Sequence, residues 1–384
     1  MSEPSIRVLQ VTGIMNRGGA ETMIMNLYRK IDRTKIQFDF VENSLDRAAY
    51  DDEIESLGGK IYRCPHFTGK NYFQYKKWWK EFFELHKGEY NIIHGHIGST
   101  AAIYLKEAKR NGLFTIAHSH NTNSGLSLGS MMYRLMSFPV RYTSDYFFGC
   151  SDEAGIDRFG KRVFCSNRYK TFHNAIDTEL FAYNEVEREK IRLEFGIKPD
   201  EIAIGHIGRF EIQKNHDFLV DIFISCLQQK NNCKLVLVGE GCLRKTIEDK
   251  VNSLKISKQV VFTGIRNDVN RIIQALDVFV FPSLFEGLPL TLVEAQSSGL
   301  QCVISDKVPV ESILVEDLIS VRRLDDAPQQ WAETILTNAI KSRFDRSKEI
   351  QSKGYDISKT SKELMNFYIN VGNCNGEKCK IKFK

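Results

Sequence analysis

Two glutamates stand eight residues apart in the segment LFEGLPLTLVEA, residues 284–295, which directly follows the apolar run DVFVFPS. Glu286 is expected in the loop that leaves a strand, and Glu294 on the second turn of a helix, because Pro289 suits the first helical position. A carboxylate accepts two hydrogen bonds, which matches a pair of neighbouring hydroxyl groups. Glu294 can therefore hold a ribose and Glu286 the hydroxyls of a second sugar; the alternative is two ordinary ion-pairing glutamates.

A second group of candidate residues follows an earlier strand, in the segment IAIGHIGRFEIQKNHDF. It contains two cations, Arg209 and Lys214, and Asn215 is a suitable N-cap for the helix that follows. Two cations beside a helix N-terminus can clamp a diphosphate, since the free N–H groups there also attract an anion. The alternative is a solvated loop. A neighbouring strand end, in LVLVGEGCL, supplies Gly239 and Gly241.

A pair of glycines, Gly18 and Gly19, precedes a helix in the segment NRGGAET. Without Cβ atoms, the backbone here can approach a ligand, and the start of the helix favours an anion. The spacing is not G-x-G-x-x-G, and no acidic residue about 20 positions on is placed to bind a ribose. A dinucleotide-binding oxidoreductase is therefore disfavoured, and a tight strand–helix turn is the alternative to a ligand site.

Four of the nine histidines lie at two strand ends of the first half. His94 and His96 occur in IIHGHIGST, and His118 and His120 in TIAHSHNTN. The H-x-H spacing places both rings of a pair on one face of a strand. A zinc site is possible by count, but no cysteine or carboxylate is evident as a further ligand. The clustering therefore favours the polar floor of a cleft.

These segments all follow short apolar runs that alternate with segments of helical periodicity. Such alternation predicts parallel sheets covered by helices on both faces, with ligands beyond the carboxyl ends of the strands. It occurs twice, which predicts two doubly wound α/β domains. The predicted strands are residues 6–12, 38–42, 60–63, 91–95, 114–117, 145–150 and 170–173 in the first half, and 202–207, 234–238, 259–263, 277–281, 301–304 and 318–321 in the second.

The length of 384 residues also suits two domains. We expect residues 1–175 to form the N-terminal Rossmann-like domain and residues 176–357 the C-terminal one, with a charged surface helix in NEVEREKIRLEFG at the junction. A helix at about 358–372 can pack back on the first domain. Residues 373–384 form a basic tail.

The composition, with 42% hydrophobic and 26% charged residues, is that of a soluble globular protein. The net charge of +5 is compatible with an acidic substrate or an anionic membrane surface, and no basic block is dense enough to indicate nucleic acid. The nine cysteines contain no CxxC pair, and Cys374 and Cys379 alone do not make a metal site. No signal peptide or apolar span is evident, so we expect a cytoplasmic protein, or one peripheral on the inner face of the membrane.

The constellation resembles the GT-B glycosyltransferases of family 4, the large retaining group, and among them the bacterial enzymes of exopolysaccharide, capsule and O-antigen synthesis. The resemblance covers nearly the whole chain and implies the GT-B fold, with two Rossmann-like domains facing across a cleft. The segments that carry it are NRGGAE, HNAIDTELF, GRFEIQKN, VGEG, FTGIRNDV and FEGLPLTLVEA.

The resemblance also implies roles for individual residues. Arg209 and Lys214 would neutralise the donor diphosphate, Glu294 would bind the ribose and Glu286 the donor sugar. His120 would lie at the donor sugar, although His118 two residues away leaves the register open. Gly18 and Gly19 would approach the phosphates from the other domain, and Gly264, Ile265 and Arg266 would lie near the base. Further donor contacts are implied at Gly239, Gly241, Gly287, Leu288, Pro289 and Leu290.

The implied reaction moves a sugar from a nucleotide-diphosphate sugar, with UDP favoured, to a glycan or lipid-linked acceptor with retention of configuration. The leaving diphosphate would help to take the acceptor proton, no metal or other cofactor is implied, and Glu286 as a covalent nucleophile is the less favoured role. A GT-B nucleotide-sugar epimerase and a non-catalytic sugar-nucleotide-binding subunit are the alternatives.

Two segments of the first half are candidates for contact with the acceptor or a membrane. In KNYFQYKKWWKEFFELHK one helical face combines aromatic residues with His86, and either covers the sheet or docks on an anionic membrane. The residues of that face are Tyr72, Tyr75, Trp79, Phe82 and His86. The second segment is MMYRLMSFPVRY, residues 131–142.

Overall fold

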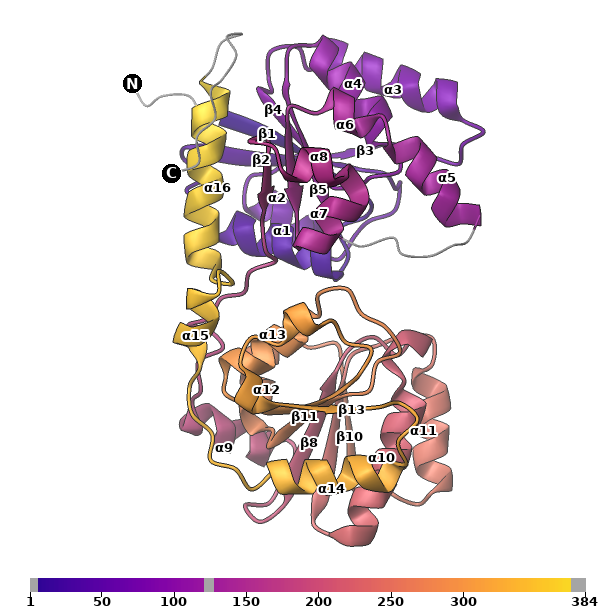
Figure 1. Ribbon diagram of the computed structural model, residues 1–384, viewed down its shortest axis with the longest axis vertical. Helices are drawn as coiled ribbons and strands as arrows, with labels where there is room; N and C mark the ends of the chain where they lie inside the picture. Colours follow the sequence, from indigo (N-terminus) through magenta and orange to yellow (C-terminus); the bar gives the residue numbers. More distant parts are fainter. Residues whose placement is uncertain (1–5, 121–127, 374–384) are drawn as a thin grey trace. The chain divides into compact units, whose positions relative to one another are not determined.

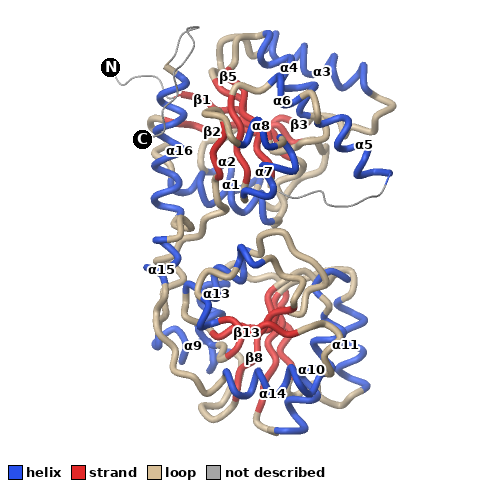
Figure 2. Tube along the Cα trace, in the orientation of Figure 1, coloured by secondary structure: helices blue, strands red, loops and turns tan. Residues whose placement is uncertain are grey.

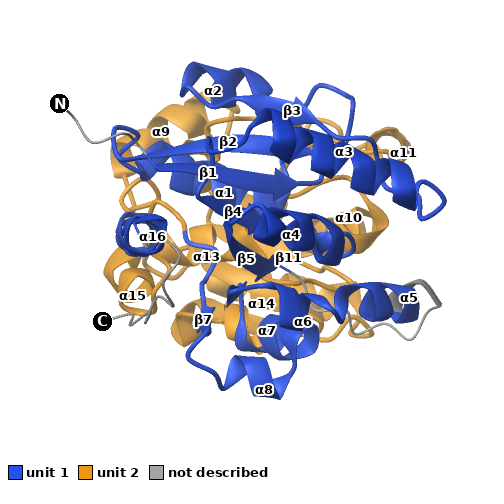
Figure 3. Cartoon of the chain, turned by 90° about the horizontal axis from the view of Figure 1, so that it is seen from above, with its two compact units in different colours: residues 1–175, 357–384 blue, residues 176–356 orange. Residues whose placement is uncertain are grey.

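The computed structural model describes residues 6–120 and 128–373. The chain divides into two compact units, residues 1–175 with 357–384, and residues 176–356 (Figure 3). Each unit is built on one parallel sheet (Figures 1 and 2). Cys374, Cys379 and nearly all of the basic tail lie outside the described residues.

The first unit has a seven-stranded sheet in the order β3-β2-β1-β4-β5-β6-β7. Its strands are β1 (Ile6–Thr12), β2 (Ile36–Glu42), β3 (Ile61–Arg63), β4 (Ile92–Gly95), β5 (Phe114–Ser119), β6 (Tyr146–Gly149) and β7 (Tyr169–Thr171). Its helices are α1 (Gly19–Lys30), α2 (Asp51–Ser56), α3 (Tyr72–Leu85), α4 (Ala101–Arg110), α5 (Leu128–Ser137), α6 (Val140–Thr143), α7 (Asp152–Phe159), α8 (Lys161–Phe164) and α16 (Ile357–Gly372).

Both faces of this sheet are buried, as the apolar strands require. Successive residues of β1 enter different cores: Val8 packs with α1 and α16, and Leu9 with α3 and α4. The last helix, α16, therefore belongs to the first unit, where Phe367 and Tyr368 are buried.

Helix α3 shows how its aromatic face is used. Tyr75, Trp79 and Phe82 are buried in the core beside α4. The face thus covers the sheet, and the hypothesis that it docks on a membrane is wrong for these three side chains. Tyr72, at the start of the helix, is 40% exposed.

The second unit has a six-stranded sheet in the order β10-β9-β8-β11-β12-β13. Its strands are β8 (Ile202–Ile207), β9 (Cys233–Val238), β10 (Val260–Gly264), β11 (Val278–Phe281), β12 (Gln301–Ser305) and β13 (Ile319–Arg322). Its helices are α9 (Glu185–Glu194), α10 (His216–Gln229), α11 (Arg244–Ser253), α12 (Val269–Ala275), α13 (Leu290–Ser297), α14 (Pro328–Asn338) and α15 (Ser347–Ser352), with short 3-10 turns η1 (Ile212–Lys214), η2 (Val310–Ser312) and η3 (Glu316–Leu318).

The two faces of the second sheet are again both buried. Ile204 packs on the face that carries α10, α11 and α14, and Ala203 on the face that carries α12, α13 and α15. All thirteen predicted strands are confirmed, with ends that differ by at most two residues. In the described parts of the chain, no helix is both long and apolar enough to cross a membrane.

Candidate functional site

The second unit brings Lys214 and Glu286 together beyond the ends of β8 and β11, which are neighbours in the sheet. Lys214 Nζ lies 2.7 Å from Glu286 Oε1, and the two side chains are only 15% and 6% exposed. Gln213 Nε2 donates to the other carboxylate oxygen of Glu286 at 3.2 Å. Two of the predicted site residues thus form a largely buried ion pair.

The loop that carries Lys214 is fixed by contacts with the loop after β11. Leu284 N donates to Gln213 O at 2.8 Å, and Lys214 Nζ lies 4.6 Å from the centre of the Phe281 ring. Asn215 precedes α10 as predicted, but its side chain makes no capping bond. Because Asn215 adopts a left-handed conformation with φ 56°, its Nδ2 donates instead to Pro282 O at 3.1 Å.

Arg209 is placed differently from Lys214. Its side chain is 64% exposed and pairs with Glu211 at 2.7 Å. The aliphatic part of Lys214 lies against Gly208, the residue before Arg209. The two cations therefore share one loop, with Lys214 buried against Glu286 and Arg209 open to solvent.

Gly239 is required by the packing of two loops. A Cβ at Gly239 would overlap Gly208 O, and its φ of 136° is unfavourable for other residues. Gly241 lies in the same way against the backbone of Phe210, whose N–H donates to Glu240 O at 2.9 Å. The glycines of VGEG thus let the β9 loop lie directly on the loop that carries the two cations.

The strand-end loop after β10 holds three residues that were expected near a base. Gly264 has φ 71°, and Gly239 N donates to its carbonyl oxygen at 3.0 Å. Ile265 is 58% exposed. Arg266 donates to Asp268 and Glu194, each at 2.7 Å, and these hydrogen bonds raise the pKa of its guanidinium. Of these two residues, Ile265 therefore has a side chain open to solvent, whereas the side chain of Arg266 is held by acidic partners.

Helix α13 carries Glu294 on its second turn. The helix begins at Leu290, so Pro289 occupies the N-cap and not the first helical position. Within residues 6–120 and 128–373 no hydrogen bond or ion pair of the Glu294 carboxylate is found, and burial raises its pKa to about 7. Ser298, expected on the same polar arc, is buried and accepts from Arg343 at 2.7 Å. Glu294 is left as an unpaired carboxylate.

The start of α13 also presents backbone donors. No acceptor within the described chain is found for the N–H groups of Gly287, Leu288 and Leu290. Gly287 is exposed and Leu288 partly exposed. Free N–H groups at a helix start form an anion site when a ligand is present.

Glu294 should make the stability of the ligand-free protein depend on pH. Its pKa rises from 4.5 to about 7 on folding, so between these values the folded state holds a proton that the unfolded chain has released. The contribution of Glu294 to the free energy of unfolding therefore falls as the pH rises through this window. We expect Glu294→Gln to gain stability over the wild type at about pH 8 but not at about pH 4.

Urea unfolding of the wild type and Glu294→Gln at the two pH values measures the difference in their free energies of unfolding. Titratable groups common to both proteins contribute equally and cancel in that difference. Glu333→Gln, at an exposed position of α14, is the control and should show no such gain. An equal effect of Glu294→Gln at both pH values would contradict the raised pKa.

In the first unit the four histidines form one cluster at the ends of β4 and β5. His96 is hydrogen-bonded to Gln10 Oε1 at 2.9 Å and to His120 at 2.7 Å. His94 is hydrogen-bonded to His118 at 3.2 Å and, through Nδ1, to the hydroxyl of Tyr368 on α16 at 2.5 Å. The H-x-H pairs do place their rings on one face, as predicted, with centroids 4.3 Å and 4.1 Å apart.

Burial lowers the pKa of every histidine in this cluster, and that of His120 falls to about 4, with a further contribution from the nearby charge of Arg158. The rings are therefore neutral at physiological pH. His118 is 3% exposed and His120 is partly buried, and each has one buried ring nitrogen without a partner. Nitrogen atoms of His94, His96 and His118 lie within 4.8 Å of one another, so these three could hold a metal ion.

Gly18 and Gly19 begin α1, with Gly18 at the N-cap. A Cβ at Gly19 would meet no atom within 4 Å, and one at Gly18 would meet only the flexible side chain of Glu21. Neither glycine is required by the packing of the unit, in contrast to Gly239. The open space beside Gly19 is what close approach of a ligand would need.

We expect Gly19→Ala to leave stability unchanged or slightly raised, because alanine favours a helix over glycine by about 1 kcal/mol. If a donor phosphate approaches this backbone, the added methyl group should lower kcat/KM by about tenfold. Thermal unfolding and initial rates measure the two effects. Gly13→Ala is the control, since a Cβ there also meets no atom within 4 Å. Equal kcat/KM values for Gly19→Ala and Gly13→Ala would exclude the approach of a donor phosphate to the Gly19 backbone.

Sequence reasoning did not find two residues of these sites. Gln213 contacts Glu286 and could have been suspected from its place beside Lys214. Arg158 lies in the ordinary-looking helical segment DEAGIDRF, but it is 8% exposed and its Nη1 has no partner. No pattern in the sequence signals that burial, because it depends on packing against other segments.

Comparisons with known proteins show the family to which this chain belongs. Residues 187–337 match the family described as glycosyl transferases group 1. The putative glycosyltransferase EpsF of Bacillus subtilis is 34% identical over 96% of this chain and 97% of its own. The capsular polysaccharide biosynthesis glycosyltransferase CapH of Staphylococcus aureus is 26% identical over 95% and 99%.

A UDP-Gal:alpha-D-GlcNAc-diphosphoundecaprenol alpha-1,3-galactosyltransferase of Escherichia coli is 26% identical over 75% of this chain and 77% of its own. Among solved structures, Anabaena Alr3699/HepE in complex with UDP superposes with a TM-score of 0.74, at 15% identity, over 95% of this chain and 100% of that one. The chain therefore has the GT-B fold and belongs to the group 1 glycosyl transferases.

Proposed function

We propose that this glycosyltransferase moves a sugar from a UDP-sugar to a glycan or lipid-linked acceptor, with retention of configuration, in the synthesis of a cell-surface polysaccharide. The observation that carries the proposal is the buried Lys214–Glu286 pair beyond β8 and β11, in the same unit as the unpaired carboxylate of Glu294. The capsular polysaccharide role of CapH, the UDP-Gal donor of the E. coli relative and the UDP bound to HepE support it.

Lys214 and Arg209 are the cations that would neutralise the donor diphosphate. In the ligand-free chain each is paired with a carboxylate, Lys214 with Glu286 and Arg209 with Glu211. A bound diphosphate would compete for both cations and free Glu286 to accept hydrogen bonds from the donor sugar. Stabilising the charge on the leaving diphosphate is then the main catalytic contribution, and no metal is needed to supply it.

The remaining roles follow from position. Glu294 would accept both ribose hydroxyls, and the free N–H groups at the start of α13 would approach the phosphates or the sugar. In the first unit, a neutral His120 or His118 would contact the donor sugar, and Gly18 and Gly19 the phosphates. The acceptor oxygen would form its bond to the sugar carbon on the face from which the diphosphate leaves, so the configuration is retained, and the acceptor proton would pass to the departing diphosphate.

The test is turnover of UDP-sugars by the purified protein with and without an acceptor extracted from membranes. UDP release that requires the acceptor, persists in excess EDTA and gives a product with the donor's anomeric configuration by NMR supports the proposal. Conversion of the donor to an isomeric sugar nucleotide without acceptor would identify an epimerase. Binding without turnover in any acceptor pool would identify a non-catalytic subunit.

A further inference from the structure

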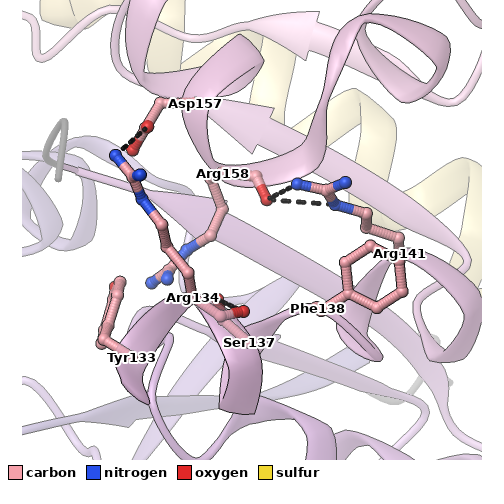
Figure 4. A pocket seen from close by; sticks show the side chains of 7 residues that line it. All are labelled: Tyr133, Arg134, Ser137, Phe138, Arg141, Asp157 and Arg158. Atoms are coloured by element: carbon pink, nitrogen blue, oxygen red, sulfur yellow. Dashed lines mark hydrogen bonds and ion pairs between the residues drawn. The ribbon is translucent and has the colours of Figure 1, made fainter. Parts of the chain in front are cut away.

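The first unit contains a pocket whose lining side chains carry more positive than negative charge. Its lining side chains, drawn in Figure 4, come from α5, α6, α7 and Phe138 between them. The volume of ≈ 100 Å³ is several times the space that one water needs. Three of its seven lining residues are arginines and one is an acid, Asp157, which lies 3.6 Å from Arg134. The lining residues are Tyr133, Arg134, Ser137, Phe138, Arg141, Asp157 and Arg158.

Arg158 is the residue that points to a ligand. It is 8% exposed, its Nη1 has no hydrogen-bond partner, and no ion pair of its guanidinium is found in the described chain. Its guanidinium lies 4.1 Å from the centre of the Tyr133 ring, and burial lowers its pKa to about 10. A buried charge without a counter-charge is costly, so an anion that entered the pocket would be strongly favoured.

The position of Arg158 links the pocket to the edge of the sheet where the histidines lie. A side chain at Gly98, in the loop between β4 and α4, would overlap Arg158 Nη2. The charge of Arg158 also reaches His120, whose pKa it lowers. The guanidinium therefore lies near the same end of the sheet as His120, the histidine expected to contact the donor sugar.

An apolar surface lies beside the arginines on α5 and α6. Met131, Met132 and Leu135 of α5 are 62%, 58% and 76% exposed. Phe138 and Tyr142, which follow, are 47% and 73% exposed. Exposed side chains of this size gathered on one short segment mark an interaction site. Arginines next to such a surface match a molecule with a charged head and a hydrocarbon chain.

We propose that this pocket binds the diphosphate of a lipid-linked sugar acceptor, with Arg158 as its central ligand and the apolar side of α5 in contact with the first isoprene units. Arg141 and Arg134 line the same pocket and would add charge-assisted hydrogen bonds to the phosphate oxygens. This site would hold the acceptor of the proposed function and therefore rests on that function. Ligand binding at the site can nevertheless be measured without any sugar transfer.

The test is calorimetric titration of the full chain with farnesyl diphosphate, farnesol and inorganic pyrophosphate. We expect farnesyl diphosphate to bind more tightly than either fragment. Arg158→Met should weaken it by about tenfold or more, because a charge-assisted contact to phosphate is lost. Arg162→Met, on the exposed surface of α8, is the control and should bind like the wild type.

Arg158→Met should fold at least as well as the wild type, since it removes an unpaired buried charge. Leu135→Asn, at an exposed position of α5, removes apolar surface without adding charge and so tests the lipid contact: it should weaken farnesyl diphosphate several-fold and leave pyrophosphate unchanged. Pyrophosphate that binds as tightly as farnesyl diphosphate would overturn the proposed contact between the isoprene units and α5. Equal affinity of Arg158→Met and the wild type for farnesyl diphosphate would overturn the site.

The failure of this inference can be told apart from the failure of the proposed function. None of the residues proposed to hold UDP is Arg158 or lines this pocket, so UDP binding should be unchanged in Arg158→Met. Loss of farnesyl diphosphate binding with intact UDP binding supports the acceptor site, whether or not transfer is detected. Transfer to a lipid-linked acceptor that proceeds equally well in Arg158→Met would refute the acceptor site and leave the transferase assignment standing.

Discussion

Replacing Lys214 by methionine should weaken the binding of UDP by about a hundredfold or more, while the affinity for uridine falls by less than about threefold. Methionine keeps the length and most of the apolar contact of the lysine stem beside Gly208 and Phe281. The lost group is the ammonium, which interacts with phosphate and not with the nucleoside. Isothermal titration with both ligands measures the two affinities.

Lys245→Met is the matched control, because Lys245 is a 78% exposed lysine that pairs with an acid on α11. It should bind UDP like the wild type. A second variant separates the loss of UDP affinity from a loss of stability. Without Lys214, the buried Glu286 carboxylate keeps only its hydrogen bond from Gln213, so its unpaired charge destabilises the fold. Adding Glu286→Gln to Lys214→Met should restore stability without restoring UDP affinity. Equal losses for UDP and uridine in Lys214→Met would exclude the diphosphate role.

Glu294→Gln should weaken UDP binding by roughly tenfold to a hundredfold and leave the binding of 2′,3′-dideoxy-UDP nearly unchanged. The substitution keeps the shape of the side chain but replaces one acceptor oxygen by a donor group, so one ribose hydroxyl loses its partner. Because no protein group pairs with this carboxylate in the described chain, the ligand is the only partner whose loss the experiment would register. Glu333→Gln again provides the control.

The comparison of the two nucleotides is the decisive measurement. If Glu294→Gln weakened UDP and its dideoxy analogue equally, the glutamate would act on the fold of α13 and not on the diol. The stabilities of the wild type and Glu294→Gln at about pH 4 and about pH 8 then show whether the Glu294 carboxylate of the wild type has the raised pKa of a buried group.

The strands were the most predictable part of this chain. Runs such as IRVLQVT and VFVF place apolar residues on both faces, which is typical of a strand in a covered parallel sheet. The approach of Lys214 to Glu286 was also predictable in outline, since both residues follow strands whose carboxyl ends share one edge of the sheet. Their direct pairing was not, because it depends on the loop geometry set by Asn215 and Gln213.

The less predictable features depend on contacts between distant segments. Asn215 has the residue type of an N-cap, yet its side chain is drawn to Pro282 O by the neighbouring loop. Ser298 belongs to the polar side of α13, but Arg343, 45 positions away, buries it. Arg158 occupies a helix whose sequence is typical of a surface helix, and its burial depends on distant residues such as Tyr133 and Gly98, which contact its guanidinium.

The return of the last helix to the first unit has a consequence for how the chain is made. The core around β1, β2 and β4 contains Leu364, Phe367 and Tyr368 of α16, which the ribosome adds after the entire second unit. Domains generally fold as units once their sequence is complete, at synthesis rates of about 5–20 residues per second. The second unit can thus reach its native state first, whereas the N-terminal half must wait roughly ten seconds or more with part of its apolar surface unprotected, which makes the nascent chain a candidate client for chaperones.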